Sequence, residues 1–108
     1  MINFGIPSSL KAWIDHVLRP GIAFRYTPKG PEGLITGKRC YLVVARGGNY
    51  LEEHMKPFNF QDTYLRVALR LVGITDIDVI SIEGVAFGPD AAERATQAAI
   101  AKVNELAR

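Results

Sequence analysis

Two short, almost uninterrupted apolar runs, at residues 39–45 and 77–82, most limit what this chain can fold into. Runs of this length are typical of strands that are buried on both faces in a parallel sheet. A segment with helical periodicity lies between them, at about 61–72, and another follows from Asp90 onward. Strands that alternate with helices predict an α/β fold with a parallel sheet.

Helical periodicity predicts three helices in all, because apolar residues recur every three or four positions. The first covers about 6–18, with an apolar face formed by Ile6, Leu10, Trp13, Ile14, Val17 and Leu18. The second ends before Gly73, a residue type common just after a helix. The third begins at Asp90, which with Glu93 makes a variant of the capping box. Its buried face is formed by Ala95, Ala99, Val103 and Leu106.

A small hairpin is expected between the first helix and the first apolar run. Ile22, Phe24 and Tyr26 alternate with small or polar residues, which predicts a strand. Residues 28–33 are rich in Pro and Gly and predict a turn. Residues 34–36 are then expected to return as a short second strand, so that the hairpin stands apart from the main sheet.

Composition excludes several classes of protein. A length of 108 residues allows one domain at most, and 48% hydrophobic residues exclude a disordered chain. The one cysteine, Cys40, is expected to be structural and excludes a disulfide framework or a thiolate metal cluster. No run approaches the roughly 18 apolar residues of a membrane span, and no signal peptide is present, which favours a cytoplasmic protein. The net charge of +2, with scattered Lys and Arg, disfavours a nucleic-acid partner.

The motifs of several enzyme classes do not occur in the sequence. Residues 33–38 differ from a P-loop, because only three residues separate the glycines and Arg39 follows the lysine. GxSxG, HExxH and CxxC are missing, so a metal site is not expected. His16 has no ligand pattern around it, and His54 is expected to face solvent. The segment 46–48 remains, since two glycines directly after a buried strand permit a sharp turn and a close approach to a ligand. Strand ends of this kind bind ligands in doubly wound sheets, so a cofactor site and an ordinary glycine turn are both open interpretations of this segment.

The number of strands does not match the number of helices. Two core strands cannot bury three amphipathic helices, and the run at 39–45 would keep one unpaired, apolar edge. The sequence is therefore interpreted as part of a doubly wound domain that lacks its first strands.

Several short segments, taken in order, resemble the FMN-dependent NADH-azoreductases, a family of flavodoxin-like quinone reductases. They are NFGIPSSLKAWID (3–15), FRYT (24–27), GPEGL (30–34), TGK (36–38), RGG (46–48), GITD (73–76), and the pairs EG (83–84) and GP (88–89). The resemblance covers essentially the whole chain and corresponds to the carboxyl-terminal half of a family member.

The resemblance implies a flavodoxin-like, three-layer α/β fold with a parallel sheet. Residues 1–108 would be the carboxyl-terminal part of a single domain, with two core strands, three helices and one hairpin excursion. The family also implies a homodimer with one FMN per subunit and a ping-pong reaction. NADH or NADPH reduces the flavin, which then reduces a quinone or an azo compound. Because FMN carries the chemistry, no catalytic side chain is expected.

The resemblance also assigns the binding residues. The cofactor is expected to lie against Met1, Ile2, Asn3, Phe4, Ala45, Arg46, Gly47, Gly48 and Asn49. The backbone of Asn3 and Phe4 would contact the polar edge of the flavin. Tyr26 would wall the substrate pocket of the partner subunit.

The chain departs from the family pattern in four places. Ile2 stands where Tyr is usual, Ala45 where Ser is usual, and Asn49 where His often follows the two glycines. The Ser-rich phosphate loop of the family has no counterpart, so the FMN phosphate lacks an anion site and the chain alone is expected to bind FMN weakly or not at all. Two alternatives stay open. One is a non-catalytic half-domain that associates through the edge of 39–45, and the other is a flavodoxin-like NAD(P)H dehydrogenase without azo activity.

Overall fold

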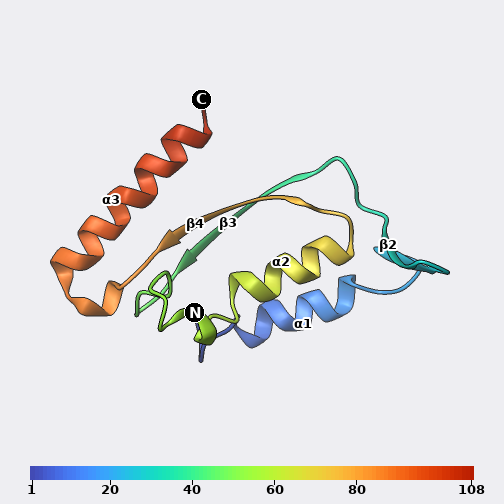
Figure 1. The fold of residues 1–108 in the computed structure, drawn as a ribbon, viewed down its shortest axis with the longest axis horizontal. Coiled ribbons are helices and arrows are strands. Elements are labelled where there is room, and N and C mark those ends of the chain that lie inside the picture. Colours follow the sequence, from blue (N-terminus) through green and yellow to red (C-terminus); the bar gives the residue numbers. More distant parts are fainter.

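The computed structural model describes all residues from Met1 to Arg108. In chain order its elements are α1 (Ser8–Val17), β1 (Phe24–Thr27), β2 (Gly30–Gly33), β3 (Arg39–Ala45), the 3₁₀ turn η1 (Lys56–Phe58), α2 (Asp62–Leu71), β4 (Asp76–Ile82), the 3₁₀ turn η2 (Val85–Phe87) and α3 (Pro89–Leu106) (Figure 1). The predicted alternation of helices and strands is confirmed.

The two apolar runs form the parallel sheet that the sequence predicts. β3 and β4 pair in parallel over their whole length, from Arg39 opposite Asp76 to Ala45 opposite Ile82. The carboxyl ends of both strands therefore lie at the same edge of the sheet, and the turns that follow them are neighbours.

The hairpin is confirmed as a separate sheet, but its second strand was placed wrongly. β1 and β2 are antiparallel, and β2 is Gly30–Gly33 rather than residues 34–36. The Thr27 hydroxyl donates a hydrogen bond to the Gly30 carbonyl at 2.6 Å, which closes a tight turn and brings Phe24 opposite Gly33. Residues 34–36 lie beyond this pairing, and the Ile35 N–H donates to the Val72 carbonyl at 2.8 Å.

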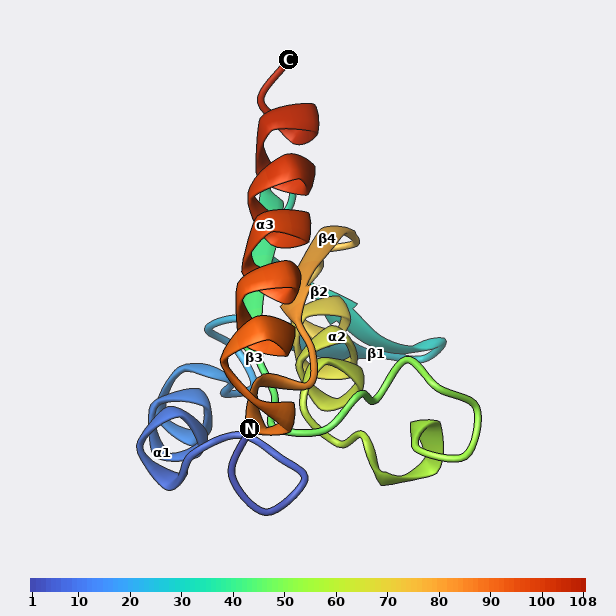
Figure 2. The same ribbon diagram turned by 90° about the vertical axis from the view of Figure 1, so that its left-hand side faces the viewer.

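The elements form three layers. Figures 1 and 2 show α3 on one side of the β3–β4 sheet and α1 and α2 on the other. Successive residues of β3 face opposite sides of the sheet, because side chains alternate along a strand. Cys40 and Leu42 line an apolar cavity of about 330 Å³ against α1 and α2, whereas Tyr41 and Val43 line another against α3.

The helices match their predicted positions, but three details differ. Trp13 is 62% exposed, and Ile14 is the one buried residue of α1. The predicted capping box at Asp90 and Glu93 is wrong, because α3 begins one residue earlier, at Pro89, and Gly88 is its N-cap. The Glu93 carboxylate accepts a hydrogen bond from the Gln97 side chain instead. Of the expected buried face of α3, Ala99 is buried and Val103 is 45% exposed.

The core is thin for a chain of this length. Only 12 of 108 residues are buried, and the radius of gyration is 15.9 Å, against about 13 Å for a folded domain of this size. β3 has a strand neighbour on one side only, and its Val43 is 67% exposed. On β4, a backbone carbonyl is bonded by a side chain of α3, because the Lys102 ammonium donates a hydrogen bond to the Val79 carbonyl at 2.7 Å.

None of the helices is long and apolar enough to cross a membrane.

Candidate functional site

Two turns meet at the carboxyl end of β3. The Met1 amino group donates a hydrogen bond to the Ala45 carbonyl at 2.9 Å, which joins the start of the chain to this strand. A cavity of about 300 Å³ opens between the turns, lined by Met1, Asn3, Phe4, Gly47, Gly48 and Tyr50. The structure thus brings together residues from both segments that the sequence singled out. We call residues 2–5 the first turn and residues 46–49 the glycine turn.

The first turn has a special backbone. Ile2 and Gly5 exchange two N–H to carbonyl hydrogen bonds of 2.9 Å, and the two residues between them have positive φ, 45° at Asn3 and 68° at Phe4. This is the φ pattern of a type I′ turn, which Asn tolerates and Phe does not favour. The Phe60 N–H donates to the Phe4 carbonyl at 2.8 Å, and the Phe4 and Phe58 rings are 5.9 Å apart, so contacts outside the turn hold it.

Replacing Asn3 by a β-branched residue tests this conformation. Asn3→Val is expected to lower the free energy of unfolding by about 1–2 kcal/mol, because β-branched side chains clash with the backbone at positive φ. Asn3→Gly, the matched control, is expected to change it by about 0.5 kcal/mol or less. Urea unfolding followed by circular dichroism measures both. Equal stabilities for the two variants would contradict the left-handed geometry.

The glycine turn presents its peptides in one orientation. The carbonyls of Arg46, Gly47 and Gly48 accept hydrogen bonds from the N–H groups of Val85, Ala86 and Gly84, at 3.1, 3.1 and 2.9 Å. In a trans peptide the carbonyl and the next N–H point in opposite directions. The N–H groups of Gly47, Gly48 and Asn49 therefore point away from residues 84–86, and none of them donates a hydrogen bond within the chain.

Unpaired N–H groups occur on both turns. Asn3 and Phe4, like Gly47, Gly48 and Asn49, have backbone N–H groups without a partner in the chain. Backbone donors are obligatory hydrogen-bonding groups. Four of these five residues, all except Asn49, line one cavity, which suits a ligand whose edge carries several acceptor atoms. The cavity has no Lys or Arg side chain in its lining. The arrangement can bind the acceptor edge of a planar heterocycle and provides no side-chain cation for a phosphate.

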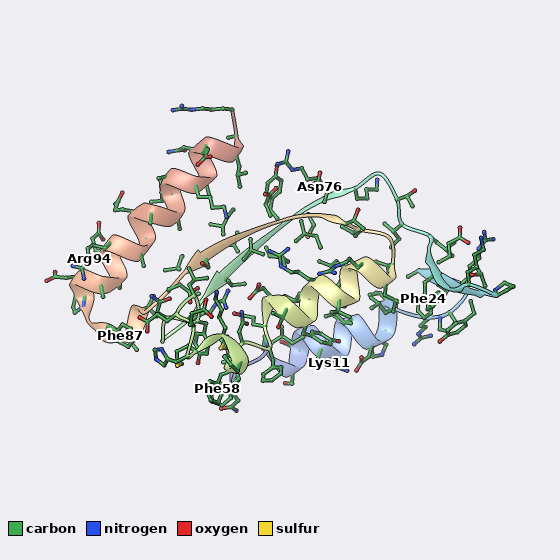
Figure 3. All side chains as sticks on the ribbon, in the orientation of Figure 1. Lys11, Phe24, Phe58, Asp76, Phe87 and Arg94 are labelled. Atoms are coloured by element: carbon green, nitrogen blue, oxygen red, sulfur yellow. The ribbon has the colours of Figure 1, made fainter.

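Several predicted site residues are not among those that line this cavity. Ile2 is 58% exposed and does not line the cavity, and Ala45 contributes its carbonyl to Met1. The Asn49 side chain accepts the Leu51 N–H at 3.1 Å. Tyr26 is 70% exposed and packs edge-to-face on Phe24, with ring centroids 5.5 Å apart. Figure 3 shows Phe24 at the hairpin end of the molecule and Phe58 towards the opposite end, so Tyr26 is remote from this cavity.

Tyr50 is a lining residue that the sequence analysis missed. It directly follows the glycine turn, and an aromatic residue next to a predicted binding turn is the sequence feature that could have predicted it. Its N–H donates to the Glu83 carboxylate at 2.8 Å, which places the residue beside the start of segment 84–86.

The Arg46 side chain is buried beside the site rather than in it. It is 1% exposed, and its guanidinium forms ion pairs with Asp62 at 2.9 Å and Glu83 at 3.1 Å. Burial alone would raise the pKa of Asp62, but the hydrogen bond from Asn59 and the charge of Arg46 outweigh it and hold that pKa below its usual range.

The lowered pKa of Asp62 predicts a pH dependence of stability. The unfolded carboxyl takes up its proton at a higher pH than the folded one, so stability is lost as the pH falls from about 4 towards the folded pKa. Asp62→Asn is expected to be less stable at pH 7 by about 2 kcal/mol, since Glu83 still pairs with Arg46, and to lose this part of the pH dependence. Urea unfolding at several pH values measures the stability of both proteins, with a substitution at an exposed glutamate, Glu105→Gln, as the control. A parallel pH profile for wild type and Asp62→Asn would contradict the prediction.

Comparison with known proteins adds three findings. A family model described as "Flavodoxin-like fold" matches residues 1–107. The chain is 52% identical over 107 residues to FMN-dependent NADH:quinone oxidoreductase 1 of Rhizobium etli, covering 99% of this chain and 52% of that protein. It is 51% identical over 108 residues to an FMN-dependent NADH:quinone oxidoreductase of Agrobacterium fabrum, covering 100% and 53%.

Two solved structures are similar as well. An azoreductase from Bacillus anthracis str. Sterne superposes with a TM-score of 0.87 at 35% identity, over 97% of this chain and 50% of that one. An FMN-dependent NADH-azoreductase from Bacillus anthracis str. Ames Ancestor, in complex with FMN, superposes with a TM-score of 0.85 at 27% identity, over 100% and 53%. The chain spans about half the length of the curated relatives it matches.

Proposed function

The chain belongs to the flavodoxin-like fold family, and on this premise we propose that it is part of an FMN-dependent NAD(P)H oxidoreductase that reduces quinones and azo compounds. The observation that carries the proposal is the set of unpaired N–H groups on the two turns around one cavity. The polar edge of the FMN ring system carries several acceptor atoms, which these donors fit. The names of the relatives and of the FMN complex support the same cofactor.

The chain's own contribution is binding and orientation. FMN, when bound, would supply the two-electron redox chemistry between NADH or NADPH and the electron acceptor, which would use the site in turn. The N–H groups of Asn3, Phe4, Gly47, Gly48 and Asn49 would hold the polar edge of the ring system. Phe4, which lines the same cavity, would form part of its wall.

We further propose that residues 1–108 form the carboxyl-terminal part of a single flavodoxin-like domain. The unpaired edge of β3, the exposed Val43 and the span of half the relatives' length support this. The phosphate site would then belong to the other part, in keeping with a cavity that no Lys or Arg side chain lines. Tyr26 would contribute to the substrate pocket of the second subunit in a homodimer, because it is remote from the cavity of its own chain.

A flavin fluorescence titration tests the proposal in two steps. The 108-residue chain alone is expected to show no micromolar binding of FMN. A chimera that joins it to the remaining half of the Rhizobium etli relative is expected to bind FMN, to bleach with NADH under anaerobic conditions and to reoxidise with benzoquinone or an azo dye. A folded chimera without FMN binding would contradict the proposed function. Micromolar binding and NADH oxidation by the chain alone would contradict the partial domain.

The free edge of β3 favours one other candidate. A half-domain without catalytic activity could associate through this edge with another chain, since an unpaired apolar strand is a template for pairing. Sedimentation of the 108-residue chain, taken with the flavin titration of the chimera, distinguishes the two. A monomer at high concentration would contradict self-association, and a stable dimer together with a folded chimera that binds no FMN would favour it.

A further inference from the structure

The burial of Arg46 calls for a function other than direct contact with a ligand. Its side chain is 1% exposed and does not line the cavity between the two turns. It lines a different, polar cavity, together with Asp62 at the start of α2. A buried guanidinium is costly unless it is paired, so the position must be held by its partners.

Arg46 connects three segments of the chain. Its Nη2 lies 2.9 Å from the Asp62 carboxylate of α2, and its Nε lies 3.1 Å from Oε2 of Glu83, which follows β4. The Nε–Oε2 contact is a charge contact without hydrogen-bond alignment. The other oxygen of Glu83, Oε1, accepts the Tyr50 N–H at 2.8 Å. Glu83 is thus held by Arg46 on one side and holds the end of the glycine turn on the other.

Glu83 directly precedes the residues that orient the glycine turn. The N–H groups of Gly84, Val85 and Ala86 are the donors to the three carbonyls of residues 46–48. Two of the three peptides in the turn begin at a glycine, and glycine permits several backbone conformations at similar cost. Without fixed donors, these peptides could turn over and exchange carbonyl for N–H at the cavity.

We propose that Arg46 is a positioning residue, which through Glu83 and Asp62 fixes residues 84–86 and so orients the N–H groups of Gly47, Gly48 and Asn49 towards a ligand. The inference rests on the proposed function for the identity of that ligand, FMN. The orientation of the peptides itself is a property of the chain and can be measured without flavin.

Site-resolved amide hydrogen exchange of the 108-residue chain tests the orientation. In Arg46→Lys, the protection of the Gly84, Val85 and Ala86 amides is expected to fall roughly tenfold or more relative to the amides of the β3–β4 ladder. Lysine keeps the charge but cannot reach two carboxylates with a planar fork. Glu83→Gln keeps nearly the same side-chain shape and is expected to give the same local loss of amide protection. It replaces Arg46→Lys in the experiment if that variant does not fold.

The matched control is Arg39→Lys. Arg39 also joins β3 to β4 by an ion pair, 2.9 Å to Asp78, but at the other end of the sheet and half exposed. Arg39→Lys is expected to leave the exchange protection of the amides of residues 84–86 unchanged. If Arg46→Lys lowers protection of the ladder and of residues 84–86 equally, Arg46 only stabilises the fold and the proposal is overturned.

Flavin affinity gives a second, separate readout. In the chimera, Arg46→Lys is expected to raise the dissociation constant for FMN roughly tenfold or more, and Arg39→Lys is expected to leave it unchanged. Local loss of protection with unchanged FMN affinity would overturn the link between the network and the ligand. A chimera that binds no FMN would contradict the proposed function, and the exchange experiment would still decide whether Arg46 orients the turn.

Discussion

Gly33→Ala is expected to lower the free energy of unfolding by about 3 kcal/mol, because a side chain at this position meets backbone on another element. A Cβ on Gly33 would lie 2.2 Å from the Gly73 nitrogen and 2.4 Å from its Cα. These atoms cannot move aside as a flexible side chain would. Gly73 itself has a φ of 103°, and the Ile35 N–H is bonded to the Val72 carbonyl beside it. The end of the hairpin is thereby fixed to the end of α2.

Urea unfolding followed by circular dichroism measures this effect, with Gly5→Ala as the control. A Cβ on Gly5 has no neighbour closer than 3.8 Å, and its φ is not positive, so a change of about 0.5 kcal/mol or less is expected. A loss of less than about 1 kcal/mol in Gly33→Ala would show that the hairpin does not pack against α2 as described.

Val43→Lys is expected to leave the stability of the chain alone almost unchanged and to destabilise the completed domain strongly. In the 108-residue chain Val43 is 67% exposed, so the change in stability is expected to be within about 0.5 kcal/mol. In the chimera with the other half of a relative, the free edge of β3 would be paired and this face covered. A lysine there would bury an unpaired charge and is expected to lower the free energy of unfolding by about 4 kcal/mol.

Val67→Lys is the matched control, because Val67 of α2 is the same residue type and is 65% exposed. It is expected to be tolerated in both proteins. Thermal and urea unfolding of the four variants measure the difference. Tolerance of Val43→Lys in a folded, FMN-binding chimera would contradict the proposal that β3 becomes a central strand.

Local sequence patterns predicted the elements well, and they failed where a single turn decided the geometry. The apolar runs and helical periodicities located β3, β4 and the three helices within a few residues. The second hairpin strand was misplaced because the Thr27–Gly30 turn set the register, and the cap of α3 because Pro89 took the first helical position. One turn residue or one proline outweighs the periodicity of a short segment.

The glycines after β3 and the resemblance located the candidate site, but they did not predict the places of two of its residues, Arg46 and Tyr50. Arg46 was expected at the cofactor, and it is buried between Asp62 and Glu83, which lie far from it in the sequence. No sequence pattern predicts Tyr50 as a site residue, and it lines the cavity. Ion pairs between distant residues leave no periodic signal, since they depend on how two loops come together.

The sequence by itself determined that the chain forms a parallel α/β unit with a glycine turn at a strand end, because apolar periodicity and backbone freedom are properties of neighbouring residues. Only the tertiary structure decided which N–H groups stay unpaired at that turn. Their orientation follows from three hydrogen bonds donated by residues 84–86 and from the buried charges of Arg46, Asp62 and Glu83. These contacts exist only once β3 and β4 have paired in parallel and brought the ends of both strands to the same edge.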